Sequence, residues 1–189
     1  DGAVTSGPLL TINEGPLAGD YDGIPAAFGG EIVDLTEDMV LVEDDENGTP
    51  DTNDACDPIT NGGDLTGKIA VIRRGECEFG FKSLAAQNEG AVAVIMVNNV
   101  DGEPVTMAPG AVGDQVTIPL FMVNNIDGEA IIEELLIASI NATINGVTVG
   151  PQIDGDLDNA IIAHEYGHGI SNRLTGGANN TSCLNNAEQ

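Results

Sequence analysis

Two continuous apolar runs in the middle of the chain predict strands at the centre of a sheet. They occupy residues 68–73 and 91–97. The second run contains only Ala, Val, Ile and Met, which is typical of a strand that is covered on both faces. A further strand is predicted at residues 118–123.

Shorter stretches predict the remaining strands. Apolar and polar residues alternate at 31–35 and at 39–43, as in half-buried strands. We also expect an edge strand near residues 9–12 and a closing strand at residues 143–149. The first 30 residues are otherwise rich in Gly, Pro and Asp and are expected to form loops.

Two segments have the spacing of amphipathic helices. In residues 79–89, Phe81, Leu84 and Ala85 fall on one side of a helix, and Gly90 is placed to end it. Asp127 is placed to cap a second helix, which we expect to run through Ile140. Its apolar positions repeat helically at Ile131, Ile132, Leu135 and Leu136.

The order of these elements predicts the fold class and the domains. Two strand–helix units in a β-rich frame predict a compact α/β domain over residues 8–149. The amino-acid composition changes at Gly150, where the sequence predicts an Asp-rich loop, then one helix and a polar tail. Residues 150–189 are too few to fold independently, so we expect them to be a fragment of another domain.

The charge of the chain excludes several classes of partner. Thirty-one acidic residues against five basic ones give a formal net charge of −26. Nucleic acids and anionic membranes are therefore not expected to bind, because both require clustered Lys and Arg. No apolar run approaches the ~18 residues that span a membrane. The charge fits a secreted protein in salt, and it also fits a Ca²⁺-binding protein.

A short motif near the end of the chain points to zinc chemistry. His164 and His168 are four residues apart, so on a helix both imidazoles lie on one face and can bind a single Zn²⁺. Glu165 stands beside the first ligand and can accept a proton from the attacking water. The chain contains two histidines, and both belong to the motif. A third protein ligand is required, yet the chain ends 21 residues after His168.

Two further features leave alternatives open. Three cysteines, an odd number, suggest one disulfide and one unpaired thiol in a secreted protein, or three free thiols in a cytosolic one. Residues 43–54 loosely match a calcium loop, and Asp154, Asp156 and Asp158 also offer oxygen ligands for Ca²⁺. A solvated acidic loop and helix capping are the simpler interpretations, so Ca²⁺ is only a second candidate cofactor.

Most of the chain resembles the protease-associated (PA) domain. The resemblance is carried by residues 67–79, by the Ala-Cys-Asp-Pro segment at 55–58 and by residues 118–123. It implies a β-rich fold with flanking helices, inserted in or attached to a secreted peptidase. PA domains are not catalytic; they are thought to bind protein segments or to control access to the active site. The resemblance also implies a disulfide between Cys56 and Cys77, which would pin the acidic loop and leave Cys183 unpaired.

The end of the chain resembles fungalysin-type secreted metallopeptidases, which are relatives of thermolysin. The similarity runs through residues 154–177, with Gly167 in place of the usual Thr. It implies that His164 and His168 are zinc ligands and that Glu165 is the catalytic base. In that family the third ligand is a glutamate just beyond an Ala-Glu-Gln run. This chain stops at that run, so the resemblance argues against Glu188 as a substitute.

The sequence therefore predicts a fragment of a secreted, extracellular zinc metalloendopeptidase with an inserted PA domain. The chain begins at Asp1 without Met, and we expect it to be a piece of a longer protein. Its expected partners are protein or peptide substrates and the rest of its own catalytic domain. The alternative is a non-catalytic PA module that binds proteins and carries an incomplete zinc site.

Overall fold

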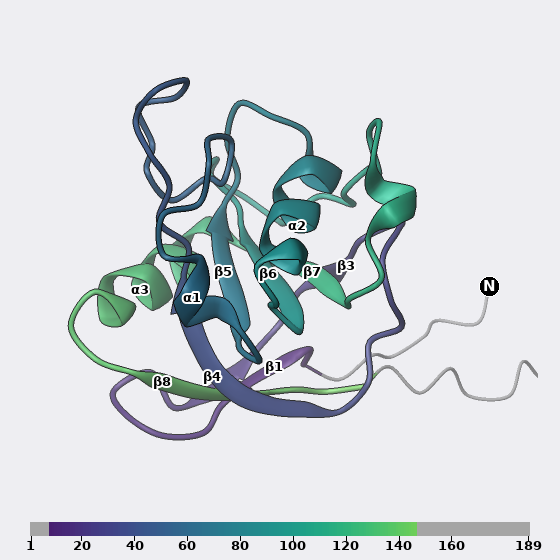
Figure 1. Cartoon of the computed structure of the whole chain (residues 1–189). Helices are drawn as coiled ribbons and strands as arrows, with labels where there is room; N and C mark the ends of the chain where they lie inside the picture. The colour runs from purple at the N-terminus through teal and green to yellow at the C-terminus, as the bar shows by residue number, and fades with distance from the viewer. Residues whose placement is uncertain (1–7, 147–189) are drawn as a thin grey trace, which may run out of the picture. The chain divides into compact units, whose positions relative to one another are not determined.

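The computed structural model describes residues 8–146. They form an α/β fold with one mixed sheet and short helices on both of its faces (Figure 1). The strands are β1 Leu10–Ile12, β2 Gly19–Tyr21, β3 Ile24–Pro25, β4 Leu35–Leu41, β5 Ile69–Arg73, β6 Ala93–Val97, β7 Leu120–Val123 and β8 Ile140–Ile144. The helices are α1 Gly62–Leu65, α2 Phe79–Asn88 and α3 Asn125–Leu135, with a 3₁₀ turn, η1, at Gly113–Gln115. The predicted domain boundary near residue 149 lies outside the described residues.

The eight strands form one sheet in the order β2-β1-β8-β4-β5-β6-β7-β3. The strands from β4 to β7 are parallel, whereas β8, β1, β2 and β3 are added in antiparallel orientation. The predicted apolar runs became β5 and β6, which pair from Ile69↔Ala93 to Arg73↔Val97. Every residue of β6 is buried, as expected of a strand that is covered on both faces.

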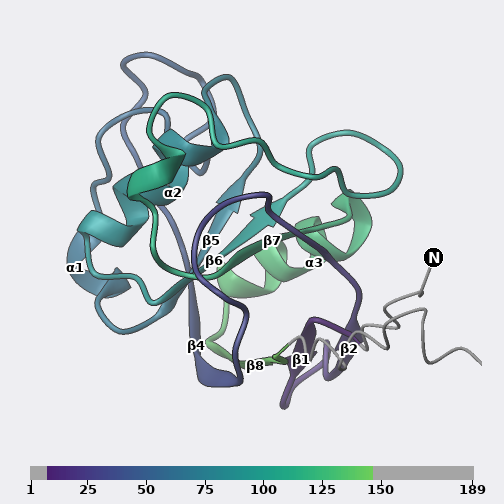
Figure 2. The ribbon, with the colours of Figure 1, turned by 90° about the vertical axis from the view of Figure 1, so that its right-hand side faces the viewer.

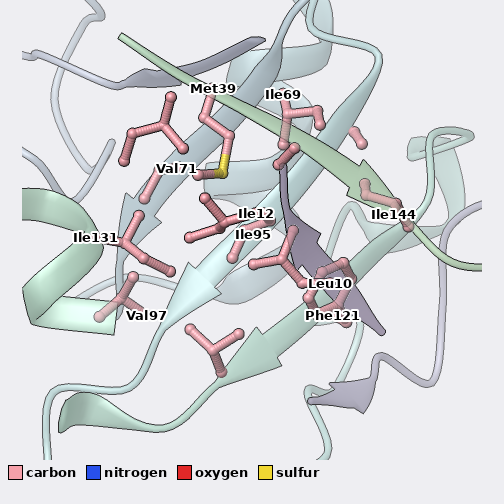
Figure 3. Packing of buried hydrophobic residues seen from close by; sticks show 14 of the residues in the cluster. Leu10, Ile12, Met39, Ile69, Val71, Ile95, Val97, Phe121, Ile131 and Ile144 are labelled. Atoms are coloured by element: carbon pink, nitrogen blue, oxygen red, sulfur yellow. The ribbon is translucent and has the colours of Figure 1, made fainter. Parts of the chain in front are cut away.

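Two hydrophobic cores lie on the two faces of the sheet. On one face, α3 and the strand β1 cover the sheet, so that Leu10 and Ile131 share a core with Ile95 (Figure 3). On the other face, α1, α2 and η1 cover the sheet, and Leu65 and Ala86 pack there. Figure 2 shows α2 and α3 on opposite sides of the parallel strands. The β-rich fold with flanking helices that the sequence predicted is therefore present.

The first helical prediction is correct in its limits. α2 begins at Phe79, ends at Asn88, and is followed by Gly90 with φ of +93°. This positive φ is strained for other residues, which explains why glycine ends the helix here.

The limits predicted for the second helix are wrong at both ends. The cap of α3 is Asn124, whose side-chain oxygen accepts a hydrogen bond from the Asp127 N–H at 2.8 Å. Asp127 lies in the first turn, where its carboxylate accepts from the Asn124 amide. The helix ends at Leu135, because Ile140 instead pairs with Met39 and begins β8. The closing strand accordingly starts three residues before its predicted position.

Residues 31–43 contain one strand where the alternation predicted two. β4 covers Leu35–Leu41 and pairs with β8 through the polar residues Glu37 and Asp38. Residues 31–34 are not in a strand. The two predicted strands overlap β4 at Leu35 and at residues 39–41, because the polar residues 36–38 interrupt the apolar pattern while their backbone remains in the sheet.

Candidate functional site

The candidate catalytic residues His164, Glu165 and His168 lie outside the described residues, as does Glu188. Within residues 8–146, the structure contains no group of three or more His, Cys, Asp or Glu residues that could hold a metal ion. The site that the structure does describe is an acidic loop, residues 43–58, together with the helix α2 beside it.

A disulfide holds the acidic loop next to the start of α2. Cys56 and Cys77 are bonded, with their Cα atoms 5.7 Å apart, as the PA resemblance implied. The Cys77 N–H also donates to the Cys56 sulfur at 3.1 Å. Closing a loop of this length stabilises a fold by about 3 kcal/mol in the chain-entropy model. The disulfide therefore gives the loop a defined position against α2.

The carboxylates of the loop organise its own backbone. Asp57 accepts hydrogen bonds from the N–H groups of Gly48 and Thr49, at 3.0 and 2.8 Å. Asp45 and Asp51 each accept from the N–H group two residues further on, which is the pattern of an Asx turn. These interactions explain the spacing of the acidic residues without a metal. The structure gives no support to the Ca²⁺ expectation for residues 43–54.

Lys82 extends from α2 into the interior behind this loop, and its side chain is fully buried. Its ammonium group donates to the Asp54 carbonyl oxygen and to the Cys56 sulfur, the latter at 3.1 Å. The Asp54 carboxylate, also buried, lies 3.7 Å away. Burial lowers the pKa of Lys82, although Asp54 and Asp44 act in the opposite direction. Burial likewise raises the pKa of Asp44, which is 5% exposed, and the nearby Asp54 adds to this effect.

Two arginines at the end of β5, Arg73 and Arg74, bind other parts of the domain, and Arg73 connects them to the loop. The Arg73 guanidinium donates two hydrogen bonds of 2.8 Å to Glu129 of α3 and also bonds to Asp51 of the loop. These contacts, with Glu129 foremost, raise the pKa of Arg73. Arg74 donates to the Asn98 side chain at 2.9 Å and lies 5.8 Å from the centroid of the Phe79 ring.

A hollow of about 300 Å³ lies between the loop and the outer side of α2. Residues 56–59 line one side of it, and Phe81, Ala85, Asn88 and Glu89 line the other. Phe81 is 47% exposed, contrary to its predicted place on the apolar side of the helix. The inward residues are Gly80, Lys82, Ser83 and Ala86. The helical spacing alone could not have revealed this rotation, because it implied that the largest apolar side chains face the core.

Comparison with known families assigns both parts of the chain. The sequence model of the PA domain matches residues 6–131, and that of the fungalysin metallopeptidases (M36) matches residues 80–189, which include His164, Glu165 and His168. The chain belongs to the fungalysin family and contains a PA domain.

Individual relatives of this fungalysin chain agree with the assignment. It is 56% identical over 41 residues to "Extracellular metalloproteinase 2" of Arthroderma gypseum, which is 22% of this chain and 6% of that protein. The chain thus spans a small part of the curated relatives that it matches. Among solved structures, an aminopeptidase from Aneurinibacillus sp. strain AM-1 is similar with a TM-score of 0.58 and 27% identity, over 75% of this chain and 31% of the other. A zinc aminopeptidase from Bacillus subtilis is similar with a TM-score of 0.51 and 25% identity, over 72% and 29%.

Proposed function

We propose that the chain is part of a secreted zinc metalloendopeptidase that hydrolyses proteins. The observation that carries this proposal is the His-Glu-x-x-His motif at residues 164–168, which holds both histidines of the chain and lies within the match to the fungalysin family. A relative named as an extracellular metalloproteinase supports secretion and metal-dependent proteinase activity. Among residues 8–146, no helix is long and apolar enough to cross a membrane.

The residues of the motif divide the chemistry among them. Two imidazoles at a helical spacing of four are the donor set that Zn²⁺ prefers, so His164 and His168 would hold the ion. The chemistry that a bound Zn²⁺ would supply there is polarisation of the substrate carbonyl and acidification of a water molecule. Glu165 then accepts the proton of the attacking water and later delivers a proton to the leaving amine.

We further propose that residues 8–149 are a non-catalytic PA domain that contacts protein substrates or controls access to the active site. In this proposal residues 150–189 are a fragment of the catalytic domain, and its third zinc ligand lies beyond Gln189. The 189-residue chain would therefore hold zinc weakly and show no peptidase activity.

A second candidate function is that of a binding module without catalysis. It is favoured by one observation: residues 8–146 form two hydrophobic cores of their own and lie largely within the match to the PA domain. The two functions are compatible for the whole protein and differ for this chain alone.

The test compares the 189-residue chain with the longer parent protein. The parent should bind one zinc ion per chain, measured by elemental analysis, and should cleave casein. Glu165→Gln in the parent should abolish cleavage while zinc remains bound, whereas His168→Ala should lose both. Zinc-dependent cleavage by the 189-residue chain alone would contradict the proposal and would point to Glu188 as the third ligand.

A further inference from the structure

The part of the chain that the structure describes carries almost no free positive charge. Residues 8–146 include 25 Asp and Glu residues but four basic residues. Three of the four form ion pairs: Lys68 with Glu37 and Asp38, Arg73 with Asp51 and Glu129, and Lys82 with Asp54. The fourth, Arg74, is bound to Asn98 and lies over Phe79. The surface of this domain is therefore strongly negative and attracts cations.

The negative charge is concentrated beside the hollow on α2. Residues 43–57 contain seven carboxylates and no Lys or Arg. Two acidic residues line the hollow itself, Glu89 and Asp57, and the Asp57 carboxylate also accepts the hydrogen bonds from Gly48 and Thr49. Arg73 pairs with Asp51 and the buried Lys82 pairs with Asp54, so five of these seven carboxylates have no basic partner among the described residues. A positively charged group that reaches the hollow would thus find carboxylates on both of its sides.

The floor of the hollow is apolar and contains an exposed aromatic ring. Phe81 and Ala85 are one helical turn apart on α2, and Pro58 and Ile59, at the end of the loop and just after it, also line the hollow. One exposed apolar residue is ordinary. Phe81 differs because the chain contains only four Phe and two Tyr residues, and because its ring borders a hollow that the disulfide holds in place. Aromatic rings in such positions are common anchors for bound polypeptides.

We propose that this hollow is a binding subsite for the polypeptide substrates of the protease, and that it takes an apolar side chain next to a Lys or Arg. The inference rests on the proposed function. The apolar side chain would pack on Phe81 and Ile59, and the neighbouring cation would meet Asp57 and Glu89. A guanidinium or ammonium group could also lie over the Phe81 ring. The volume of about 300 Å³ is at the small end of the range for ligand pockets, which suits one or two side chains.

The test measures binding by fluorescence anisotropy with the 189-residue chain in EDTA, so that zinc chemistry does not contribute. The first labelled peptide is Gly-Ser-Lys-Leu-Arg-Gly-Ser. Two comparison peptides replace Lys and Arg with Glu, or Leu with Ser. The first peptide should bind, and each comparison peptide should bind at least about tenfold more weakly, because each removes one of the two recognition elements.

Variants of the chain locate the site. Phe81→Ala should weaken binding about tenfold. Glu89→Gln should weaken it about twofold to threefold and reduce its dependence on salt. The matched control is Ile126→Ala, which removes a 77% exposed apolar side chain from α3, on the opposite face of the sheet. This control should bind the peptide like the original chain.

Several outcomes would overturn the inference. It fails if Phe81→Ala binds like the original chain, if Ile126→Ala loses as much affinity, or if the Ser peptide binds as tightly as the Leu peptide. It also fails if the longer parent does not bind the peptide, because another part of the protein would then cover the hollow. A parent that binds zinc but cleaves no protein would contradict the proposed function instead, whatever the binding result.

Discussion

Replacing Lys82 with Met should destabilise the domain strongly, because it leaves a buried carboxylate without its cation. The Lys82 and Asp54 side chains are 0% and 1% exposed, and their charged groups lie 3.7 Å apart. Asp54 Oδ2 has no hydrogen-bond partner among the described residues, so the ammonium group is its main compensation. The same ammonium also binds the Asp54 carbonyl oxygen and the Cys56 sulfur.

The expected loss follows from the cost of an unpaired buried charge. Removing one partner of a buried ion pair costs about 3–5 kcal/mol. Met has nearly the length of Lys and remains apolar, so little of the loss should come from a cavity. A second substitution, Asp54→Asn, removes the remaining charge. The double variant should therefore be clearly more stable than Lys82→Met alone, since an amide costs less to bury than a carboxylate.

The assay is urea unfolding of the 189-residue chain, followed by circular dichroism. Lys68→Met is the matched control, because Lys68 also pairs with carboxylates, Glu37 and Asp38, but on the surface. Its loss should be much smaller than that of Lys82→Met. Equal unfolding midpoints for Lys82→Met and the original chain would refute the reasoning. A double variant no more stable than the single one would show that the unpaired carboxylate is not the cause.

Three other predictions concern the same fold. Burial raises the pKa of Asp44, so its charge destabilises the folded state at neutral pH, and Asp44→Asn should stabilise the chain there. In urea unfolding at a series of pH values, this gain in stability should shrink as the pH falls through the raised pKa toward the ordinary value of 3.8. Gly80→Ala should cost about 2 kcal/mol or more in thermal unfolding, because a Cβ would overlap the Pro109 carbonyl oxygen, whereas Gly63→Ala in α1 meets no atom within 4 Å and should be neutral or stabilising by up to about 1 kcal/mol. A chain that ends at residue 150 should unfold cooperatively with the stability of the 189-residue chain, and a large loss would show that the predicted domain boundary is wrong.

The central strands and the first helix could be predicted because their patterns are local. Continuous apolar runs identified β5 and β6, and Gly90 marked the end of α2. The end of α3 could not be predicted in this way. The apolar residues from Ile131 to Ile140 continue a helical pattern, but Ile140 pairs with Met39, about 100 residues earlier in the chain. A contact of this kind overrides local periodicity and is not visible in it.

The exposure of Phe81 and the burial of Lys82 could not be predicted from the sequence, for a related reason. Periodicity assigned Phe81 to the core and gave no role to Lys82, yet the structure reverses the two. The cause is the close approach of α2 to η1: a Cβ on Gly80 would overlap the Pro109 carbonyl oxygen, so small residues must face inward. Lys82 can be buried among them because the acidic loop supplies Asp54. The disulfide, by contrast, was predicted from the PA resemblance, which carries information about pairing that the residue spacing lacks.

Because the surface is strongly negative, added salt should increase the stability of the chain but weaken the binding of a basic peptide at the hollow. Because the described part has 25 carboxylates and few basic residues, its folded state suffers self-repulsion, which salt screens over about 8 Å at physiological strength. Adding salt should therefore raise the urea midpoint of the chain. Salt should also weaken the binding of the basic peptide at the hollow beside Phe81, because the same ions screen its attraction to Asp57 and Glu89. If binding weakened only because the protein unfolded, both quantities would fall together. Opposite salt responses in one buffer series would thus separate recognition by charge from loss of structure, and peptide binding that does not weaken with salt would contradict a carboxylate-lined subsite.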